Sequence, residues 1–277
     1  MMERWYVDIS DWNPSPGEFS SAMSVLPQHE QSSITRYVRI EDRKMATVSR
    51  LLQYVLVHQV MGIQFDEIVI RRTVEGKPYL EYDGAEPMYP NFNFNVSHHG
   101  DFVGIASEPL YIVGLDIVSP VVPVNESVQD FIQHFSSYFT SLEWDRITNA
   151  GNSDEILTEF YRYWCLKEAF VKAIGAGLSY QVDKLEFHHS GWADLKVQIS
   201  GRNTNEWKFL LHDLGKGHWA SVAIGHPRYA AESFKKISKW LELTEEQVSI
   251  EIPIPNARFV KKTVEQLIQA AQKAISM

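Results

Sequence analysis

The sequence predicts an α+β protein built from two similar halves, and three observations lead to this prediction. Segments that alternate like strands are mixed along the chain with segments of helical periodicity. Residues 99–106 and 218–225 each place a strand of small and apolar residues directly after a histidine, which indicates an internal repeat. Residues 119–125 contain two prolines and have the composition of a linker. We therefore expect an N-terminal α+β subdomain over residues 1–118, a C-terminal α+β subdomain over 119–227, and a helical C-terminal extension over 228–277.

Length and composition limit the class of protein. At 277 residues, 44% of them hydrophobic, the chain is long enough for two modest domains or one large one. Lysine and arginine number 26 against 35 acidic residues, a net charge of −9, which argues against a broad nucleic-acid-binding surface. The single cysteine, Cys165, cannot form an intrachain disulfide. The first residues lack the apolar core of a signal peptide, and no apolar run approaches the ~20 residues of a membrane span, so we expect a soluble, cytoplasmic protein without membrane contact.

The first subdomain is predicted to begin with a strand over residues 5–10, a helix over 18–26, a second helix over 28–60 with a break near residues 41–42, and a strand over 65–72. The second helix has a basic side formed by Arg36, Arg39, Arg43, Lys44 and Arg50. A turn over residues 73–80 follows, and Arg72 and Lys77 flank it. Two cations on one turn suit an anionic ligand, although the same composition is common in ordinary hairpins.

Residues 91–106 alternate polar and aromatic side chains and predict a hairpin with Ser97, His98 and His99 near its tip. Adjacent Ser97 and His98 do not indicate a serine hydrolase, because neighbouring residues cannot supply the separated nucleophile and base, and no G-x-S-x-G occurs. A histidine that donates a hydrogen bond to a phosphate fits this hairpin better.

The next predicted strand, residues 111–118, is apolar except for one carboxylate, Asp116. Gly114 lies two residues earlier and permits close approach of another backbone. Because a buried carboxylate is costly without a cation, Asp116 is expected to have one. Both a structural salt bridge and a metal site satisfy this expectation.

In the second half, the spacing of Thr140 and Glu143 has the form of a capping box and predicts a helix start. The aromatic-rich residues 131–139 before it offer an apolar surface for a partner. A long helix follows the loop 149–154, and Gly175 and Gly177 mark its end. Antiparallel strands are then predicted over 184–188, 195–199, 207–211 and 218–224, and the tail is predicted to hold two amphipathic helices separated by residues 252–256.

The long helix carries the most informative polar residues. An apolar stripe at helical spacing is formed by Leu166, Phe170, Ala173 and Ile174. Trp164, Glu168 and Lys172 form a second row at i, i+4 and i+8. The simplest interpretation of Glu168 and Lys172 is a surface ion pair worth about 0.2–0.5 kcal/mol. The flanking Trp164 and the end of the helix at Gly175 favour a row of functional residues instead.

Three motifs occur in a fixed order: N-x-S-H ending at His98, G-x-D ending at Asp116, and W-x-x-K-E-x-x-x-K ending at Lys172. In order and spacing the chain resembles the Sfp-type 4′-phosphopantetheinyl transferases over roughly residues 30–225. It is most similar to the animal members of that family, which also show an R-T-x-x-G-K-P turn, here Arg72 to Pro78, and an F-T-x-x-E-W segment, here Phe139 to Trp144.

The resemblance implies two α+β subdomains related by a pseudo-twofold axis, with coenzyme A and Mg²⁺ in the cleft between them, in a monomeric enzyme. The implied reaction moves phosphopantetheine from coenzyme A to a serine of an apo acyl or peptidyl carrier protein and releases adenosine 3′,5′-bisphosphate. If the chain is the organism's only such enzyme, the implied carriers include a fatty-acid synthase carrier domain and an aminoadipate-reducing enzyme.

The resemblance also implies roles for individual residues. Asp116 and Glu168 would hold Mg²⁺, whose preference for hard oxygen ligands they satisfy. Lys172 would neutralise the pyrophosphate, and Glu168, Lys172 or a metal-bound water would act as the base. The implied nucleotide and phosphate contacts are Arg72, Thr73, Gly76, Lys77, Val96, Ser97, His98 and His99.

Two positions depart from the family pattern. Bacterial members have a second carboxylate where this chain has Val118, and the arginine that animal members carry near the start of the second helix falls at Ser33. Arg36 or Arg43 would have to replace that arginine.

Two other functions remain open at this stage. One is a catalytically silent module that binds coenzyme A or a carrier protein, and the other is a metal-dependent phosphohydrolase that uses the same two carboxylates. The intact set of Asp116, Glu168 and Lys172 argues against the silent module.

Overall fold

The computed structural model describes residues 2–82, 89–177, 180–238, 252 and 258–276. The helices are α1 (Pro16–Ser24), α2 (Gln28–Ile34), α3 (Ile40–Met61), α4 (Val128–Gln133), α5 (Ser141–Thr148), α6 (Ser153–Ile174), α7 (Glu232–Lys235) and α8 (Val264–Ile275), with short 3₁₀ turns η1 (Ser136–Tyr138), η3 (Val182–Lys184) and η4 (Pro227–Tyr229). The strands are β1 (Arg4–Asp8), β2 (Ile70–Arg72), β3 (Pro78–Leu80), β4 (Asn93–His99), β5 (Phe102–Glu108), β6 (Ile112–Val118), β7 (Leu185–Ser190), β8 (Ala193–Ile199), β9 (Arg202–Thr204), β10 (Trp207–Gly215), β11 (His218–Gly225) and β12 (Val260–Lys262).

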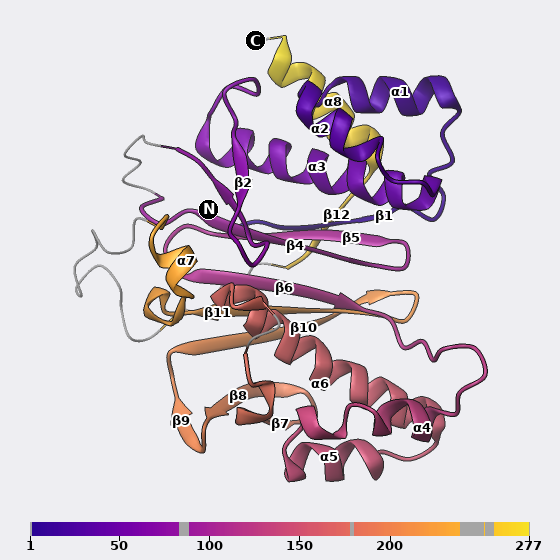
Figure 1. The fold of residues 1–277 in the computed structure, drawn as a ribbon, viewed down its shortest axis with the longest axis vertical. Coiled ribbons are helices and arrows are strands. Elements are labelled where there is room, and N and C mark those ends of the chain that lie inside the picture. The colour runs from indigo at the N-terminus through magenta and orange to yellow at the C-terminus, as the bar shows by residue number, and fades with distance from the viewer. Residues whose placement is uncertain (1, 83–88, 178–179, 239–251, 253–257, 277) are drawn as a thin grey trace.

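Two sheets lie face to face in the middle of the molecule, and helices cover their outer sides (Figure 1). The first sheet has the order β12-β1-β5-β4, and the second has the order β10-β11-β6. The long helix α3 packs against the first sheet together with α8, while α6 packs against β6 and β11 of the second sheet. The predicted α+β class is therefore confirmed.

The buried apolar residues form three clusters that correspond to these layers. One cluster joins α3 and α8 to the first sheet, and a second surrounds α6. The third fills the space between the two sheets with side chains such as Phe102, Leu115 and Val222. Burying aliphatic side chains contributes roughly 1.5–3 kcal/mol each, so the apolar contact between the sheets helps to hold the two halves together.

A ladder of polar side chains on β4 joins the two sheets through hydrogen bonds. Asn93 Oδ1 accepts from the Val113 amide at 3.0 Å, Asn95 Oδ1 from the Leu115 amide at 2.9 Å, and Ser97 Oγ from the Ile117 amide at 3.1 Å. Because side chains at i, i+2 and i+4 of a strand point to the same face, they act as a row of acceptors for alternate amides of β6. This ladder explains the alternating polar pattern of residues 91–97.

Gly114 lies where α6 crosses β6, and the predicted close approach is confirmed. A Cβ atom at this position would collide with the backbone of Ala169 and Ala173 on α6. The helix can therefore lie directly on the strand, which brings its row of polar residues beside Asp116.

Some predicted boundaries were wrong. The break in the second helix lies over residues 35–39 rather than at 41–42, and only residues 70–72 of the predicted strand 65–72 form a strand. The extension after residue 227 is not only helical, because β12 adds a parallel strand beside β1. The first predicted helix of the tail falls largely on residues 239–251, outside the described residues.

The predicted division at residues 118 and 227 stays a prediction, as does the twofold relation between the halves. β6 precedes the first boundary in sequence, yet it hydrogen-bonds to β11 in the second sheet. β12 and α8 follow the second boundary but pack on the first half.

Candidate active site

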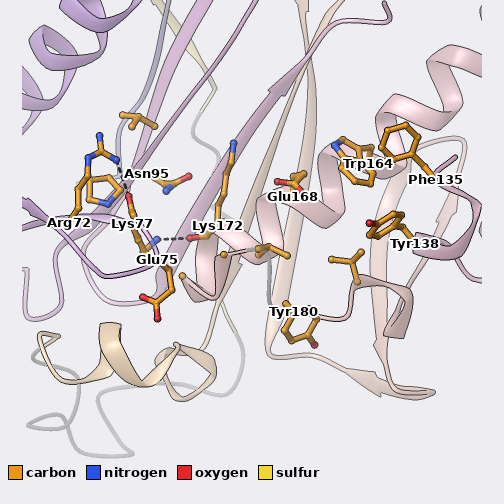
Figure 2. Close-up of a pocket in the computed structure, with 17 residues that line it drawn as sticks. Arg72, Glu75, Lys77, Asn95, Phe135, Tyr138, Trp164, Glu168, Lys172 and Tyr180 are labelled. Carbon is orange, nitrogen blue, oxygen red and sulfur yellow. Dashed lines mark hydrogen bonds between the residues drawn. The ribbon is translucent and has the colours of Figure 1, made fainter. Parts of the chain in front are cut away.

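A cavity of about 540 Å³ lies between the β2–β3 turn, β4 and α6 (Figure 2). Among the residues predicted from sequence, the cavity is lined by Arg72, Gly76, Lys77, Val96, Glu168 and Lys172. Sequence analysis had not assigned the lining residues Glu75, Pro78, Asn95, Val171, Tyr180 and Val182 to a site. The β2–β3 end of the cavity therefore has two basic side chains, Arg72 and Lys77, beside the acidic Glu75, and the cavity becomes more apolar along α6.

The predicted row on α6 faces this cavity. Trp164, Glu168 and Lys172 all line it and follow one another along the helix in Figure 2. The apolar stripe of the same helix is buried, with Leu166 and Ala173 fully inaccessible to solvent. The helix begins with a capping box at Asn152 and ends at Gly175, whose φ of 72° suits a glycine C-cap. Both faces predicted from periodicity are thus confirmed.

Three polar side chains form a triad at the end of this row. They are Lys172 of the row itself and, behind it, Ser97 of β4 and Asp116 of β6. The Lys172 ammonium lies 2.5 Å from Asp116 Oδ1 and donates to Ser97 Oγ at 3.0 Å. Ser97 Oγ in turn donates to Asp116 Oδ1 at 3.2 Å. The cation that the buried Asp116 carboxylate requires is therefore provided by Lys172, which comes from the facing helix.

Glu168 lies beside this triad without a partner of its own: within the described part of the chain it makes no hydrogen bond or ion pair. Burial and then the Asp116 carboxylate raise the pKa of Glu168, although Lys172 acts in the opposite direction. Burial alone would lower the pKa of Lys172, but the carboxylates of Asp116 and Glu168 outweigh it and raise that pKa. The site thus holds two coupled carboxylates and one ammonium.

His98 and His99 end β4 next to the triad. His98 is exposed, and His99 is half-buried. Partial removal from water and then the Lys172 ammonium lower the pKa of His98. Burial likewise lowers the pKa of His99, while Asp116 opposes this. Both histidines are therefore close enough to the triad to sense its charges, although neither lines the cavity.

The β2–β3 turn forms the cationic end of the cavity. Arg72 Nη1 donates to the Gly76 carbonyl at 2.9 Å, and Thr73 Oγ1 accepts from the Lys77 amide at 3.2 Å. Burial and then the Arg50 guanidinium lower the pKa of Arg72. The arginine of α3 whose charge acts on Arg72 is therefore Arg50. From sequence, Arg50 was assigned only to the basic side of the predicted second helix.

The two arginines proposed as substitutes for the family arginine differ in their surroundings. Arg43 donates to the Tyr37 carbonyl at 2.7 Å and to the Thr35 carbonyl at 3.3 Å, so it holds the loop between α2 and α3. Arg36 lies in that same loop and is exposed. Neither residue lines the cavity.

Lys167, the first lysine of the W-x-x-K-E-x-x-x-K motif, has a structural role. Its amine lies 2.8 Å from Glu143 Oε2 and donates to the carbonyls of Val182 and Leu185. Glu143 also accepts from the amide of Phe187 at 2.9 Å, and it caps α5 as predicted. This fully buried network fixes the segment that carries Val182 at the edge of the cavity.

Two family models and several curated relatives match the chain. Residues 10–110 match "4'-phosphopantetheinyl transferase, N-terminal", and residues 112–224 match "4'-phosphopantetheinyl transferase superfamily". The L-aminoadipate-semialdehyde dehydrogenase-phosphopantetheinyl transferase of Rattus norvegicus is 35% identical over 85% of this chain and 80% of its own length. The chain belongs to the 4′-phosphopantetheinyl transferase superfamily. The Xenopus laevis protein of the same name is 33% identical over 87% of this chain and 82% of its own length. A phosphopantetheinyl transferase of Thraustochytrium is 30% identical over 87% of this chain and 84% of its own length.

Membership of this superfamily confirms the resemblance inferred from the three motifs. The transferase models meet between residues 110 and 112, directly before β6. The triad of Ser97, Asp116 and Lys172 therefore draws residues from both matched regions. None of the helices in the described ranges is long and apolar enough to cross a membrane.

The carboxylates of this superfamily member fit a hard divalent cation. Among the described residues no group of three or more His, Cys, Asp or Glu side chains is gathered as a metal site. Asp116 and Glu168 nevertheless couple electrostatically, and Glu168 has no other partner in the described chain. Two carboxylates suit Mg²⁺, which usually binds through one or two protein carboxylates together with water and substrate phosphates.

The far end of the transferase cavity is aromatic. Trp164 contacts Phe135 and Tyr138 edge-on, with ring centroids 5.3 and 5.7 Å apart. Tyr138 is 45% exposed, and Leu142, four residues later on α5, is 37% exposed. The apolar surface predicted for residues 131–139 thus opens directly into the cavity.

Proposed function

We propose that this protein transfers 4′-phosphopantetheine from coenzyme A to a serine hydroxyl of an apo acyl or peptidyl carrier protein and releases adenosine 3′,5′-bisphosphate. One observation carries the proposal. In a chain of this superfamily, Glu168 and Lys172 line one cavity, Asp116 pairs with Lys172 behind its wall, and the two ends of the cavity differ in character, one cationic and one aromatic. Such a cavity suits a substrate with a charged nucleotide and a neutral arm.

The two carboxylates are proposed to hold Mg²⁺. When bound, Mg²⁺ would neutralise charge on the pyrophosphate that is broken. Lys172 is proposed to add a fixed positive charge beside that position, since its ammonium is already held by Asp116 and Ser97. These charges act where negative charge develops on the leaving phosphate, so they favour the transition state over the bound substrate.

The β2–β3 turn is proposed to receive the nucleotide. Arg72 and Gly76 line the cavity on one side, with Thr73 in the same turn, and Val96 with the neighbouring His98 lies on the other. Arg72 is supported by its place in the cavity lining, where a guanidinium can bind a phosphate through two parallel hydrogen bonds. Ser97 and His99 support the site from behind.

The aromatic end is proposed to face the carrier protein. Tyr138 leaves apolar surface at this end of the cavity, and Leu142, four residues later, is another exposed apolar side chain. A serine presented there would reach the row on α6. The proposed carriers are a fatty-acid synthase carrier domain and an aminoadipate-reducing enzyme, and the names of the relatives support the second of these.

One incubation tests this function. The protein is mixed with an apo carrier protein, coenzyme A and Mg²⁺, and the carrier is weighed by mass spectrometry. A carrier that gains one phosphopantetheine, only when coenzyme A and enzyme are both present, supports the proposal. A carrier of unchanged mass contradicts it, and cleavage of coenzyme A without any carrier would indicate a phosphohydrolase instead.

A further inference from the structure

Lys77 crosses from the β2–β3 turn into the second half of the molecule. Its side chain is buried, and its amine donates to the carbonyl oxygens of Val113 on β6 and Lys172 on α6, both at 2.8 Å. Figure 2 shows the bond from Lys77 to the backbone of Lys172. One side chain therefore connects a turn of the first half with a strand and a helix that carry the site.

The protein itself uses most of the donors of the Lys77 amine. An ammonium has three N–H donors. Two point to the carbonyls, and the ring of Phe234 lies 4.9 Å from the nitrogen on another side. Burial also lowers the pKa of Lys77 to about 7. In the neutral form the two remaining donors match the two carbonyls, so that form cannot contact a phosphate without breaking these bonds, and the charged form keeps a single N–H that the carbonyls do not use.

The contact between the turn and the end of α6 depends on glycine. Gly175 has a φ of 72°, and a Cβ atom there would lie 3.0 Å from Lys77 Cδ. Gly177 has a φ of 58°, and its Cβ would lie 3.4 Å from Glu75 Cβ. Glu75 in turn accepts from the Ser233 hydroxyl at 2.5 Å. The glycine-rich stop after α6 thus lets the turn pack closely against the helix end.

Lys77 binds the helix at the residue whose side chain serves the site. Helices end with carbonyl groups that need partners outside the helix, and Lys77 provides one for Lys172. The Lys172 side chain leaves the same residue and reaches Asp116 and Ser97. A shift of the Lys172 backbone would therefore move its ammonium away from Asp116.

We propose that Lys77 is a positioning residue, which fixes the last turn of α6 through the Lys172 carbonyl and so holds the Lys172 ammonium in place for transfer. This inference rests on the proposed function and revises the role that the family resemblance implies for Lys77. A residue that acts through Lys172 lowers kcat, because Lys172 stabilises charge that develops in the transition state. A phosphate ligand would mainly raise KM for coenzyme A.

The test is Lys77→Met, which keeps the alkyl stem and removes every donor. With coenzyme A and an apo carrier protein, kcat is expected to fall about tenfold or more, while KM for coenzyme A and its affinity by calorimetry stay within about twofold. A tenfold rise in KM with kcat unchanged would overturn the inference. If Lys77→Met does not fold, Lys77→Gln, which keeps one amide donor group, is tested in its place. The change in its kcat is again compared with the change in its KM for coenzyme A.

A double variant separates positioning from general destabilisation. In a Lys172→Met background, Lys77→Met should lower kcat by less than about twofold, because the group it positions is gone. If Lys77→Met lowers kcat in that background by the same factor as in the wild-type protein, the inference is overturned. A variant that has a lower melting temperature but unchanged kcat and KM would also overturn it.

Lys216→Met is the matched control. Lys216 also connects the two halves, since its amine donates to Asp8 and Ser10 at 2.8 Å, but it lies outside the cavity. Its loss should change stability and leave kcat unchanged. The proposed function is judged separately, by whether the wild-type protein modifies the carrier at all.

Discussion

The side-chain oxygen of Asn95 accepts the backbone amide of Leu115 at 2.9 Å, in the place where a neighbouring strand would offer a carbonyl. It is the middle rung of the ladder that joins β4 to β6, and both residues are buried. The last rung, Ser97 to Ile117, adjoins Asp116 and Lys172. The element that joins the halves therefore also sets the position of the triad.

Asn95→Ala should destabilise the protein. The substitution leaves the Leu115 amide buried without an acceptor, which typically costs about 1–3 kcal/mol. Urea unfolding measures the change in the free energy of unfolding. Asn203→Ala, on the exposed edge strand β9, is the control and should cost almost nothing. Equal costs for the two variants would show that the ladder does not hold the sheets together.

Glu168→Gln should abolish transfer and leave binding of coenzyme A largely intact. The amide keeps the shape of the side chain but loses the charge that a metal or a proton requires. Retention of more than about a tenth of wild-type kcat, which corresponds to less than ~1.4 kcal/mol of lost transition-state stabilisation, would contradict the role. Glu155→Gln on the same helix is the control, because glutamine can also serve in a capping box.

Arg72→Ala should raise KM for coenzyme A more than it lowers kcat. A nucleotide contact away from the reacting bond binds substrate and transition state alike. Calorimetry with coenzyme A measures the affinity directly. Arg71→Ala is the matched control, since Arg71 pairs with Glu81 and its side chain is 58% exposed. Unchanged affinity in Arg72→Ala would remove this residue from the site.

Sequence periodicity predicted the common face of the α6 row, because that pattern is local. Trp164, Glu168 and Lys172 are separated by single helical turns, so their common face follows from helix geometry alone. The direction of the Lys77 amine could not be predicted, because its acceptors lie 36 and 95 residues away in the chain. From sequence, Lys77 on a glycine turn was interpreted as a cation for an anionic ligand, whereas tertiary packing buries its side chain.

The same difference between local patterns and long-range contacts explains the errors in the predicted fold. β12 consists of only three residues, Val260–Lys262, two of them exposed, so it has no alternating pattern to reveal it. It exists because β1 offers a free edge more than two hundred residues earlier in the chain. The break at residues 35–39 also lacks a proline or glycine. Arg43, by binding the carbonyls of Thr35 and Tyr37, stabilises that break instead.

Glu108 should make stability depend on pH. Its carboxyl is buried beside Arg4, and burial raises its pKa to about 8 despite that cation. The folded state therefore binds more protons than the unfolded state between about pH 4.5 and 8, so this group's contribution to stability is lost as the pH rises through that window, by at most ~1.4 kcal/mol per pH unit.

Glu108→Gln removes this titration. The stability of the variant relative to wild type should rise from pH 5 to pH 8, as measured by urea unfolding at several pH values. Glu265→Gln, exposed on α8, should show no such trend. A constant difference between Glu108→Gln and wild type across the range would mean that the carboxyl titrates normally.

Val118→Glu tests where the metal binds. Val118 is two residues after Asp116 on β6, so the two side chains point to the same face of the strand. Val118 is only 3% exposed, and a carboxylate placed there is costly unless a cation shares it. The variant should therefore melt at a lower temperature than wild type without Mg²⁺ and recover part of the difference when Mg²⁺ is added.

Mg²⁺ affinity itself should follow the number of oxygen ligands. Asp116 and Glu168 alone should bind Mg²⁺ only weakly, since this ion prefers six oxygens and gives up its waters reluctantly. Coenzyme A supplies pyrophosphate oxygens, so Mg²⁺ and coenzyme A should each tighten binding of the other by the same factor. Val118→Glu should raise affinity in the absence of coenzyme A, whereas Val121→Glu, on the exposed linker nearby, should not. Calorimetry on wild type and both variants, with and without coenzyme A, measures this, and equal Mg²⁺ affinity throughout would show that the metal is not held by Asp116 and Glu168.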